Sequence, residues 1–520
     1  MNLINYADSA LSLLPPVVAI VLAVFTRKVL LSLGVGIIIG ALLLTDFNLA
    51  NTASFIGDTA TGLVWDDGAL NAWNLNILGF LVLLGMITAL ISVSGSSRAF
   101  ADWAKERIRN KRDAKLMTMV LGCAVFIDDY FNSLVVGSIS RPITDRYHIS
   151  RAKLAYLLDS TAAPVCVISP ISSWGAYIIA LIGGILTAHG FADTGHLTIF
   201  MQMIPMNFYA IFALLLLLCV AMFTLDVGPM RQHEQNAQKG ELYDESKGMP
   251  PGATADLPEA DTGKISGLFV PILVLIAATV FFMISSGADA LAADNKPFSV
   301  LGAFENTDVA QSLLYGGLVG FVVTFILAFV QKVAFNMIAK GMLMGAKSML
   351  PAIYILLFAW SIAGVIGQLE TGKYMASLAT GNIPFELLPA VLFLLAGLTA
   401  FSTGTSWGTF GIMLPIAADM AMGSDSTMML PMLSAVLAGA VFGDHCSPIS
   451  DTTILSSTGA SCHHLDHVWT QLPYAVIVAL ISIAGYIVLG FTSSVLFGLA
   501  TASVLFVISV LVLKAKSNAQ

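Results

Sequence analysis

Long apolar segments, separated by short polar ones, make up most of the chain. Several of them approach the roughly 20 apolar residues that an α-helix needs to cross a bilayer. Examples are Leu13 to Phe25, Leu214 to Leu225, Phe269 to Ile284 and Val504 to Leu513, each together with its flanks. The pattern predicts an all-α polytopic membrane protein.

The same short motif interrupts two of these segments. Val-Ile-Ser-Pro-Ile-Ser-Ser occupies residues 167–173, and His-Cys-Ser-Pro-Ile-Ser-Asp occupies residues 445–451. Each motif places a proline and several hydroxyl or acidic side chains where an uninterrupted helix is expected, which is typical of broken transmembrane helices. A duplicated broken helix indicates a substrate or ion site near the midplane of a secondary transporter.

Lysine and arginine near the ends of apolar segments predict which loops are cytoplasmic. Arg27 and Lys28 place the first loop inside, whereas the acidic loop of residues 46–73 has no Lys or Arg and is expected outside. The N-terminus is then also outside. Lys514 and Lys516 place the C-terminus inside.

Two basic loops, residues 98–115 and 141–153, follow each other closely. The apolar segment between them, Leu116 to Ile139, therefore starts and ends on the cytoplasmic side and cannot be a single span. We expect a re-entrant hairpin with a polar tip, which is tolerated only where it is buried in protein or lines a cavity. The polar residues near its middle are Asp128, Asp129 and Asn132.

A second hairpin is expected over about Pro384 to Met422, entering from the outside, with its tip at residues 401–408. Each half of the chain then has about five spans, so the halves form inverted-topology repeats, and one extra C-terminal span brings the total to about 11. The expected divisions are residues 1–225 (first repeat), 226–264 (a flexible cytoplasmic linker), 265–492 (second repeat) and 493–520 (extra span and tail).

Two hairpin tips and two helix breaks should meet near the midplane, where hydroxyls, carboxylates and free carbonyls supply the hard oxygen ligands that Na+ prefers. We expect one cluster from the first half and a counterpart from the second. The candidates are Asp128, Asn132, Ser169 and Ser172 in the first cluster, and Thr403, Thr405, Ser447, Ser450 and Asp451 in the second.

Carboxylates are the strongest candidates, because an ionised Asp at a helix centre costs roughly 2.5 to 3.5 kcal/mol on insertion scales. Desolvation favours the protonated form and a bound cation favours the ionised one, so one site can exchange Na+ for H+. Asp129, Asp159 and Asp444 are further candidates for ion or proton binding. Three structural alternatives stay open: Asp159 caps a neighbouring helix, Asp128 or Asp129 pairs with Arg141 or Lys153, and the hydroxyls bond their own helices.

Aromatic and histidine residues near the breaks suggest further roles. Trp174, Trp360 and Trp407 each lie beside a polar break and either wall a substrate pocket or pack in the core. The residues expected to line a substrate are Trp174, Ser406, Trp407, His445 and Thr452. Cys462-His463-His464-Leu-Asp466-His467 has metal-ligand residue types without zinc spacing, and is either a pH-sensitive or solvated cluster or, less simply, a metal site.

Composition agrees with the membrane prediction: 57% of residues are hydrophobic and 11% are charged. The net charge is -8, with the acidic surplus largely in loops, and no basic run suggests a nucleic-acid partner. The five cysteines lack CxxC spacing and are expected to pack in the core. The N-terminus shows no cleaved signal peptide. No cofactor is expected besides Na+ and H+ as coupling ions, and membrane lipid is the surrounding partner.

Two other function classes fit the sequence less well. Gly404-Thr405-Ser406-Trp407-Gly408 fits the G-x-S-x-G pattern of serine hydrolases, with His445 downstream, but that motif needs a strand-to-helix elbow on a soluble sheet, so intramembrane hydrolysis is a remote alternative. A passive channel suits the repeat with oppositely facing hairpins less well than alternating access does.

Read together, residues 126–132 (Phe-Ile-Asp-Asp-Tyr-Phe-Asn), 163–174 (Ala-Pro-Val-Cys-Val-Ile-Ser-Pro-Ile-Ser-Ser-Trp) and 443–453 (Gly-Asp-His-Cys-Ser-Pro-Ile-Ser-Asp-Thr-Thr) resemble the NhaC-type Na+/H+ antiporter family over nearly the whole chain. That family is grouped with an ion transporter superfamily. The resemblance implies opposed hairpins, two broken helices, a dimerising scaffold and elevator-like movement, with Na+ and substrate held at the candidate residues above. NhaC-like proteins also include malate/lactate exchangers and amino-acid carriers, but the Asp-Asp-Tyr and Ser-Thr-Gly-Thr tips depart from the pattern of dicarboxylate carriers.

The sequence thus predicts a sodium-coupled secondary transporter of the bacterial inner membrane, not an enzyme, and most simply a Na+/H+ antiporter. The alternative is a Na+-coupled carrier or exchanger of a small organic solute, such as an amino acid or a carboxylate. A homodimer is expected from the resemblance.

Overall fold

The computed structural model describes residues 3–518 except 27, 67, 106–107, 127, 171, 189–195, 253–259, 372–373, 375–382 and 425. Arg27 and part of the predicted linker therefore lie outside the described residues. Apart from one two-stranded hairpin, the described elements are helices. This agrees with the predicted all-α class.

The first half of the chain runs through η1 (Ala10–Leu13), α1 (Leu14–Thr26), α2 (Val29–Leu44), α3 (Leu49–Gly62), β1 (Trp65–Asp66), β2 (Ala69–Leu70), α4 (Ala72–Val93), α5 (Ser96–Lys105), α6 (Lys111–Ala124), α7 (Asp129–Arg146), α8 (Arg151–Cys166), α9 (Ser173–Ala188), α10 (His196–Met203), η2 (Ile204–Met206) and α11 (Phe208–Phe223). Strands β1 and β2 pair antiparallel, with Trp65 opposite Leu70.

The rest of the chain runs through α12 (Pro229–Gln238), η3 (Glu245–Lys247), α13 (Ser266–Ala293), α14 (Val300–Glu305), α15 (Val309–Val330), α16 (Phe335–Gln368), η4 (Phe385–Leu387), α18 (Leu388–Thr403), α19 (Ser406–Ser424), η5 (Ser426–Met428), α20 (Met429–Cys446), α21 (Asp451–Gly459), α22 (His464–Thr492) and α23 (Val495–Asn518).

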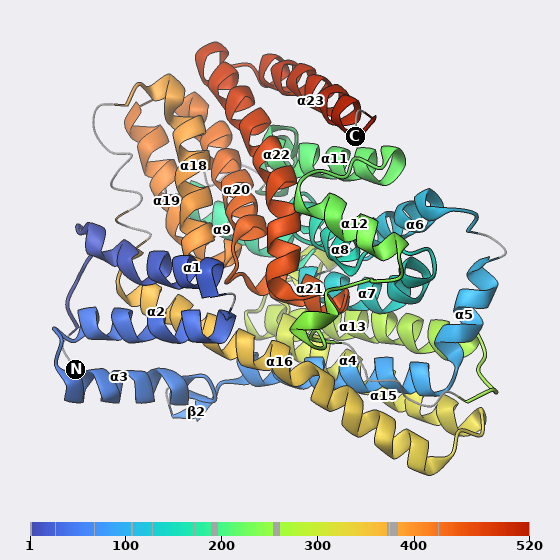
Figure 1. The fold of residues 1–520 in the computed structure, drawn as a ribbon. Helices are drawn as coiled ribbons and strands as arrows, with labels where there is room; N and C mark the ends of the chain where they lie inside the picture. Colours follow the sequence, from blue (N-terminus) through green and yellow to red (C-terminus); the bar gives the residue numbers. More distant parts are fainter. Residues whose placement is uncertain are drawn as a thin grey trace.

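Two groups of helices enclose the interrupted segments (Figure 1). Helices α4, α13, α15 and α16 pack side by side in one group, and α18, α19, α20 and α22 form the other. The short helix α21 contacts α7, α8 and α22 as well as α16. The polar breaks are therefore surrounded by packed helices, which is the only setting in which irregular backbone is tolerated at membrane depth.

Eight of the described helices are long and apolar enough to cross a membrane, or up to nine if the pair Leu197–Met206 and Phe208–Phe223, bent by 56°, forms one span. The chain is therefore a multi-pass membrane protein.

The linker differs from the flexible connection expected from its composition. Its described residues include α12, whose Met230, Glu234 and Ala237 are buried at the i, i+4, i+7 spacing of one helix face. Glu234 Oε1 accepts from the Ser150 backbone N–H at 2.9 Å and from its hydroxyl at 2.7 Å, at the N-cap of α8. An average over the linker's composition conceals this short amphipathic stripe.

Further along the linker, Lys247 bridges two carboxylates. Its Nζ lies 3.1 Å from Asp244 and 2.6 Å from Asp466 at the start of α22. Hydrogen bonds from Ser246 and Lys247 lower the pKa of Asp244 to about 2, so this carboxylate is ionised at neutral pH. The linker is thus fastened to the helix that carries the histidine motif.

Glycines allow α18 and α20 to cross closely. A Cβ added to Gly439 would lie 2.1 Å from the Phe393 carbonyl oxygen, which is backbone and cannot yield as a side chain can. We expect Gly439→Ala to destabilise the protein by about 1–3 kcal/mol through overpacking. Thermal unfolding in detergent measures the effect. Gly364→Ala is the matched control, because a Cβ there meets nothing within 4 Å; an unchanged midpoint for Gly439→Ala would contradict the close crossing.

Candidate functional site

The two Ser-Pro-Ile-Ser motifs form the two helix breaks. Helix α8 ends at Cys166 and α9 begins at Ser173, while α20 ends at Cys446 and α21 begins at Asp451. In both motifs the last serine N–H donates to the first serine carbonyl, at 3.4 Å from Ser172 to Ser169 and at 3.4 Å from Ser450 to Ser447. The duplicated sequence therefore folds locally in the same way twice.

The last serine of each motif also caps the following helix. Ser172 Oγ accepts from the Gly175 N–H at 2.8 Å, and Ser450 Oγ accepts from the Thr453 N–H at 3.4 Å. Such caps satisfy backbone donors that a broken helix leaves without partners. Both hydroxyls are thus committed to holding the breaks.

The tip of the first hairpin lies between α6 and α7 and is held by Asn132. Its Nδ2 donates to the carbonyls of Gly122 at 2.6 Å, Val125 at 2.8 Å and Thr161 at 3.1 Å. Because the amide nitrogen is fully used, the Oδ1 atom faces the other way, and it has no hydrogen-bond partner among the described residues.

The tip of the second hairpin lies between α18 and α19 and rests on the second break. Gly404 ends α18 with a φ of 71°, and a Cβ there would lie 2.5 Å from the Ile449 carbonyl oxygen. Only glycine suits both the left-handed backbone and this close approach. Ser447 strengthens the contact, since its hydroxyl donates to the Phe401 carbonyl at 2.7 Å.

A cavity of about 240 Å³ lies where both hairpin tips meet the second break. It takes three carboxylates from the two halves of the chain: Asp128 and Asp129 from the first hairpin and Asp451 from the second break. Asp129 and Asp451 are the first residues of α7 and α21, where the helix dipole stabilises negative charge. The lining residues are Trp73, Ile77, Asp128, Asp129, Tyr130, Val309, Ala359, Trp360, Ala363, Thr403, Gly404, Thr405, Trp407, Ile449 and Asp451.

Each of the two helix-terminal carboxylates has one aromatic donor. Trp174 Nε1 donates to Asp129 Oδ1 at 2.9 Å, and the Tyr130 hydroxyl donates to Asp451 Oδ2, which joins the first hairpin to the second break. Asp129 Oδ2 is buried without a hydrogen-bond partner among the described residues, as is Asn132 Oδ1. Two buried acceptors without donors suit a cation or an added proton.

Aromatic rings wall the cavity. Trp407 stacks on Tyr177 with 4.7 Å between ring centroids and packs edge-on against Trp174 at 6.0 Å. Trp360 and Trp73 line the cavity as well. Trp174 is completely buried behind the wall, so its part is to position Asp129.

Asp444 lies apart from the residues that line the cavity. It accepts from the hydroxyls of Ser406, at 2.7 Å, and Ser450, and it is completely buried. The Thr452 and Ser450 hydroxyls lie 2.9 Å apart. The Thr403 hydroxyl donates to the Thr399 carbonyl at 2.9 Å, which is the bond within its own helix that was the structural alternative for these hydroxyls. This network braces the second break against α19.

The hydrolase pair is not assembled. The Ser406 hydroxyl bonds Asp444 and the Ala440 carbonyl, whereas the ring nitrogens of His445 lie at 3.1 Å from the Tyr209 hydroxyl and 3.3 Å from the Asp159 carbonyl. A serine nucleophile needs its base within hydrogen-bond reach.

Asp159 belongs to a second buried cluster. Its carboxylate accepts from Ser456 at 3.0 Å and from Gln471, and lies 3.3 Å from His467 Nε2. The cations proposed as alternative partners of Asp128 and Asp129 bind elsewhere: Lys153 pairs with Asp226, and Arg141 donates to Ser461 and to the Gly252 carbonyl.

Comparison with known proteins assigns the family. A family model described as the Na+/H+ antiporter family matches residues 165–491. The chain belongs to this family. An uncharacterised protein of Haemophilus influenzae is 51% identical over 99% of this chain and 97% of its own length.

Two more distant relatives carry names. The arginine/ornithine antiporter ArcD of Halobacterium salinarum is 37% identical over 30% of each chain. The malate-2H+/Na+-lactate antiporter of Bacillus subtilis is 34% identical over 28% of this chain and 31% of its own. For a member of the Na+/H+ antiporter family, the cavity described above is the natural candidate site.

Sequence reasoning missed several residues of this antiporter-family chain. Tyr130 lies inside the quoted hairpin motif, but nothing in the sequence showed that its hydroxyl reaches Asp451. The solvated interpretation of the histidine motif is wrong for His464 and His467, which are buried, because they begin a packed helix. Among the described residues, no three His, Cys, Asp or Glu side chains converge as they would around a metal ion.

The Tyr130–Asp451 bond is testable by removing one oxygen. Tyr130→Phe leaves the ring and deletes a hydrogen bond to a buried carboxylate, which we expect to cost about 1.5–3 kcal/mol of stability. Thermal unfolding in detergent gives the shift, and Tyr315→Phe, at a ring that is 40% exposed, is the control. Equal stability of the two variants would contradict a structural bridge between the hairpin and the break.

Proposed function

We propose that this chain is a Na+/H+ antiporter that works by alternating access, with Na+ bound in the cavity beside Asp128, Asp129 and Asp451. Family membership supports secondary antiport. The single observation that carries the ion assignment is that carboxylates from both halves of the chain line one cavity, where Asp129 Oδ2 lacks a hydrogen-bond partner among the described residues. Because no three acidic side chains of the described residues converge on one point, Na+ would be held by one or two of these carboxylates together with neutral oxygens.

Electrostatics explains why such a site exchanges ions. Carboxylates that share a buried cavity cannot all be ionised without a counterion, because like charges disfavour each other and burial disfavours each charge. One bound Na+ or one added proton neutralises the same excess negative charge. The two ions therefore compete, and competition at a site open to one side at a time produces exchange.

Neutral oxygens would complete the sodium shell. Thr403 and Thr405 line the cavity, and Asn132 Oδ1, in the same hairpin as Asp128 and Asp129, has no hydrogen-bond partner among the described residues. Na+ is here cargo, and no further cofactor is proposed. Asp444 and the break serines Ser169, Ser172, Ser447 and Ser450 support the site by holding the backbone around it.

The repeated break supports an inverted repeat, with the divisions and about 11 spans expected from the sequence. By resemblance we propose elevator-like movement in a homodimer, in a bacterial inner membrane, with the N-terminus outside and the C-terminus inside. The bond between Tyr130 and Asp451 joins the hairpin and the break that such a movement would carry together.

A second candidate function is exchange of a small organic solute with Na+. The aromatic wall of Trp73, Trp360 and Trp407 favours it, as do the names of the malate/lactate and arginine/ornithine antiporters. The cavity volume does not favour this function, because about 240 Å³ is below the roughly 300–1,000 Å³ of typical small-molecule sites.

The deciding experiment is Na+-induced collapse of an imposed pH gradient in liposomes that contain this protein and no organic solute. We expect collapse with Na+ or Li+ but not with K+. Asp129→Asn and Asp451→Asn should each slow it at least about ten-fold, since each removes a charge that holds the cation. Asp261→Asn, at a side chain that is 97% exposed, is the control and should match the unsubstituted protein.

A flat trace from sealed liposomes that contain folded protein would contradict Na+/H+ antiport. Uptake of malate, lactate, arginine or ornithine would then identify the organic-solute function. Full activity of both aspartate variants would instead contradict the assignment of the cavity as the Na+ site.

A further inference from the structure

Asp159 and His467 form a buried pair that the sodium cavity does not include. Both side chains are completely buried, and His467 Nε2 lies 3.3 Å from Asp159 Oδ2. Neither residue lines the cavity that holds Asp129 and Asp451. The molecule therefore has a second titratable centre among its transmembrane helices.

The hydrogen bonds around the pair allow it to gain or lose one proton. Asp159 accepts from Ser456 and Gln471, but the contact with His467 is not an aligned hydrogen bond, and neither ring nitrogen of His467 has another hydrogen-bond partner among the described residues. With the imidazole protonated to imidazolium and the carboxylate ionised, the pair is neutral overall. Without that added proton a lone carboxylate is left buried, and with a further proton on the carboxylate a lone imidazolium is left; both states are costly.

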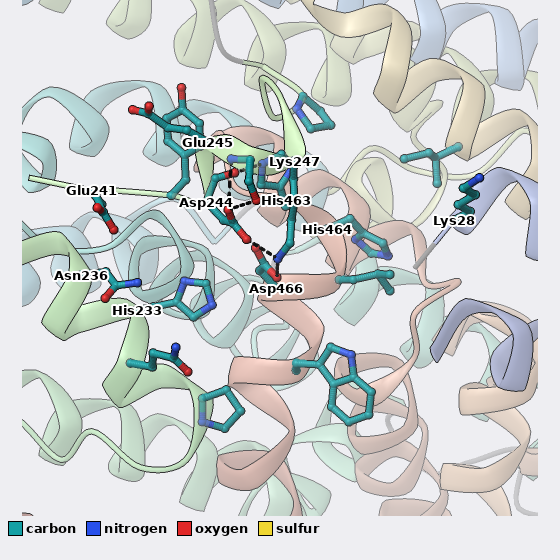
Figure 2. Close-up of a pocket in the computed structure, with 18 of the residues that line it drawn as sticks. Lys28, His233, Asn236, Glu241, Asp244, Glu245, Lys247, His463, His464 and Asp466 are labelled. Carbon is teal, nitrogen blue, oxygen red and sulfur yellow. Dashed lines mark hydrogen bonds and ion pairs between the residues drawn. The ribbon is translucent and has the colours of Figure 1, made fainter. Parts of the chain in front are cut away.

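A wide cavity leads toward this pair from the side of the linker. It has a volume of about 1430 Å³ and lies between the linker, α2, α16 and the start of α22. Figure 2 shows His463 and His464 on its wall, near the bridge of Lys247 with Asp244 and Asp466. His467 follows His464 by three residues on α22, so it lies one turn deeper on the same side of the helix.

His464 also connects this route to the second break. Its Nε2 lies 2.8 Å from the carbonyl oxygen of Pro448, inside the Ser-Pro-Ile-Ser motif, and its Nδ1 lies 3.4 Å from the Ser457 hydroxyl. The break ends three residues later at Asp451, which borders the sodium cavity. A change of charge beside His464 is thus felt by the backbone that positions a sodium ligand.

The other ionisable groups near the pair come from each neighbouring helix. Apart from His467 itself, they are His445, Asp444 and Cys446 from α20, His464 from α22, and Tyr209 from α11. His445 Nε2 donates to the Asp159 backbone carbonyl at 3.3 Å, not to its carboxylate. His467 is therefore the basic side chain placed at the Asp159 carboxylate.

We propose that Asp159 and His467 are a proton site separate from the sodium cavity, loaded from the wide cavity past His464. The proposal rests on the proposed Na+/H+ antiport and refines it, because Na+ and H+ then occupy different sites coupled through the second break instead of competing only at one.

The test separates two transport modes in the same liposomes. Exchange of labelled Na+ for unlabelled Na+ needs only the sodium cavity, whereas Na+-driven proton movement needs the proton site as well. We expect His467→Gln and Asp159→Asn to reduce proton movement at least about ten-fold, because each removes one member of the pair that holds the proton. Sodium-for-sodium exchange should stay near the unsubstituted rate. The pH dependence of the remaining activity should flatten.

The double variant Asp159→Asn with His467→Gln protects the test against misfolding, since it leaves no unpaired buried charge. His148→Asn is the control: this histidine is exposed, and asparagine tolerates its φ of 51°. Equal loss of both transport modes, or no loss of proton movement, would overturn the proposal.

Proton binding by the purified protein gives a readout that does not require antiport. We expect the unsubstituted protein to take up about one proton more than the double variant when the medium is acidified across the pH range in which Na+ drives proton movement. An absent difference would overturn the proton site. A flat pH-gradient trace from the unsubstituted protein, with the proton difference present, would instead contradict only the proposed antiport.

Discussion

A helix that stops among packed apolar helices exposes backbone groups that must find partners, and this constraint organises the site. The chain meets it twice with the same four residues, Ser-Pro-Ile-Ser, whose last serine caps the next helix and whose first serine carbonyl accepts from that cap residue's N–H. The caps fix where α9 and α21 begin. The second hairpin tip rests on the second break through Ser447, and Asp129 is held through Trp174 of the helix that follows the first break.

Around the second break, the polar groups divide into those that hold backbone and those that face the cavity. Ser447, Ser450 and Asp444 are occupied by bonds to the neighbouring hairpin and to one another. Asp451, only one residue beyond the cap, borders the cavity and receives Tyr130 from the other half of the chain. The same short segment therefore carries residues that hold the backbone and residues that line the cavity, which is why the motif contains so many polar residues.

The sequence predicted much of this arrangement, because its signals were local. Apolar runs indicated membrane helices and the proline-containing motifs indicated two breaks. The sequence placed the candidates of the two halves in two clusters that meet, whereas Asp128, Asp129 and Asp451 line one cavity. Contacts between residues far apart in the chain could not be predicted from the sequence. Nothing in the sequence could show that Tyr130 meets Asp451, or that His467 turns inward to Asp159, since both depend on how helices cross. The linker was misjudged because three buried positions in α12 are hidden in an otherwise polar composition.

The packed linker acts as a mechanical restraint on the protein. Near its middle it bonds to α8, where the Arg151 N–H donates to the Leu242 carbonyl at 2.9 Å, and to α22 through Lys247. Farther along it bonds to the opposite helix group, where the Gly252 N–H donates to the Ser348 carbonyl of α16 at 3.1 Å. Any sliding of one group past the other must stretch or release these bonds. In the proposed elevator-like movement, these bonds of the linker would limit how far the two helix groups can slide past each other.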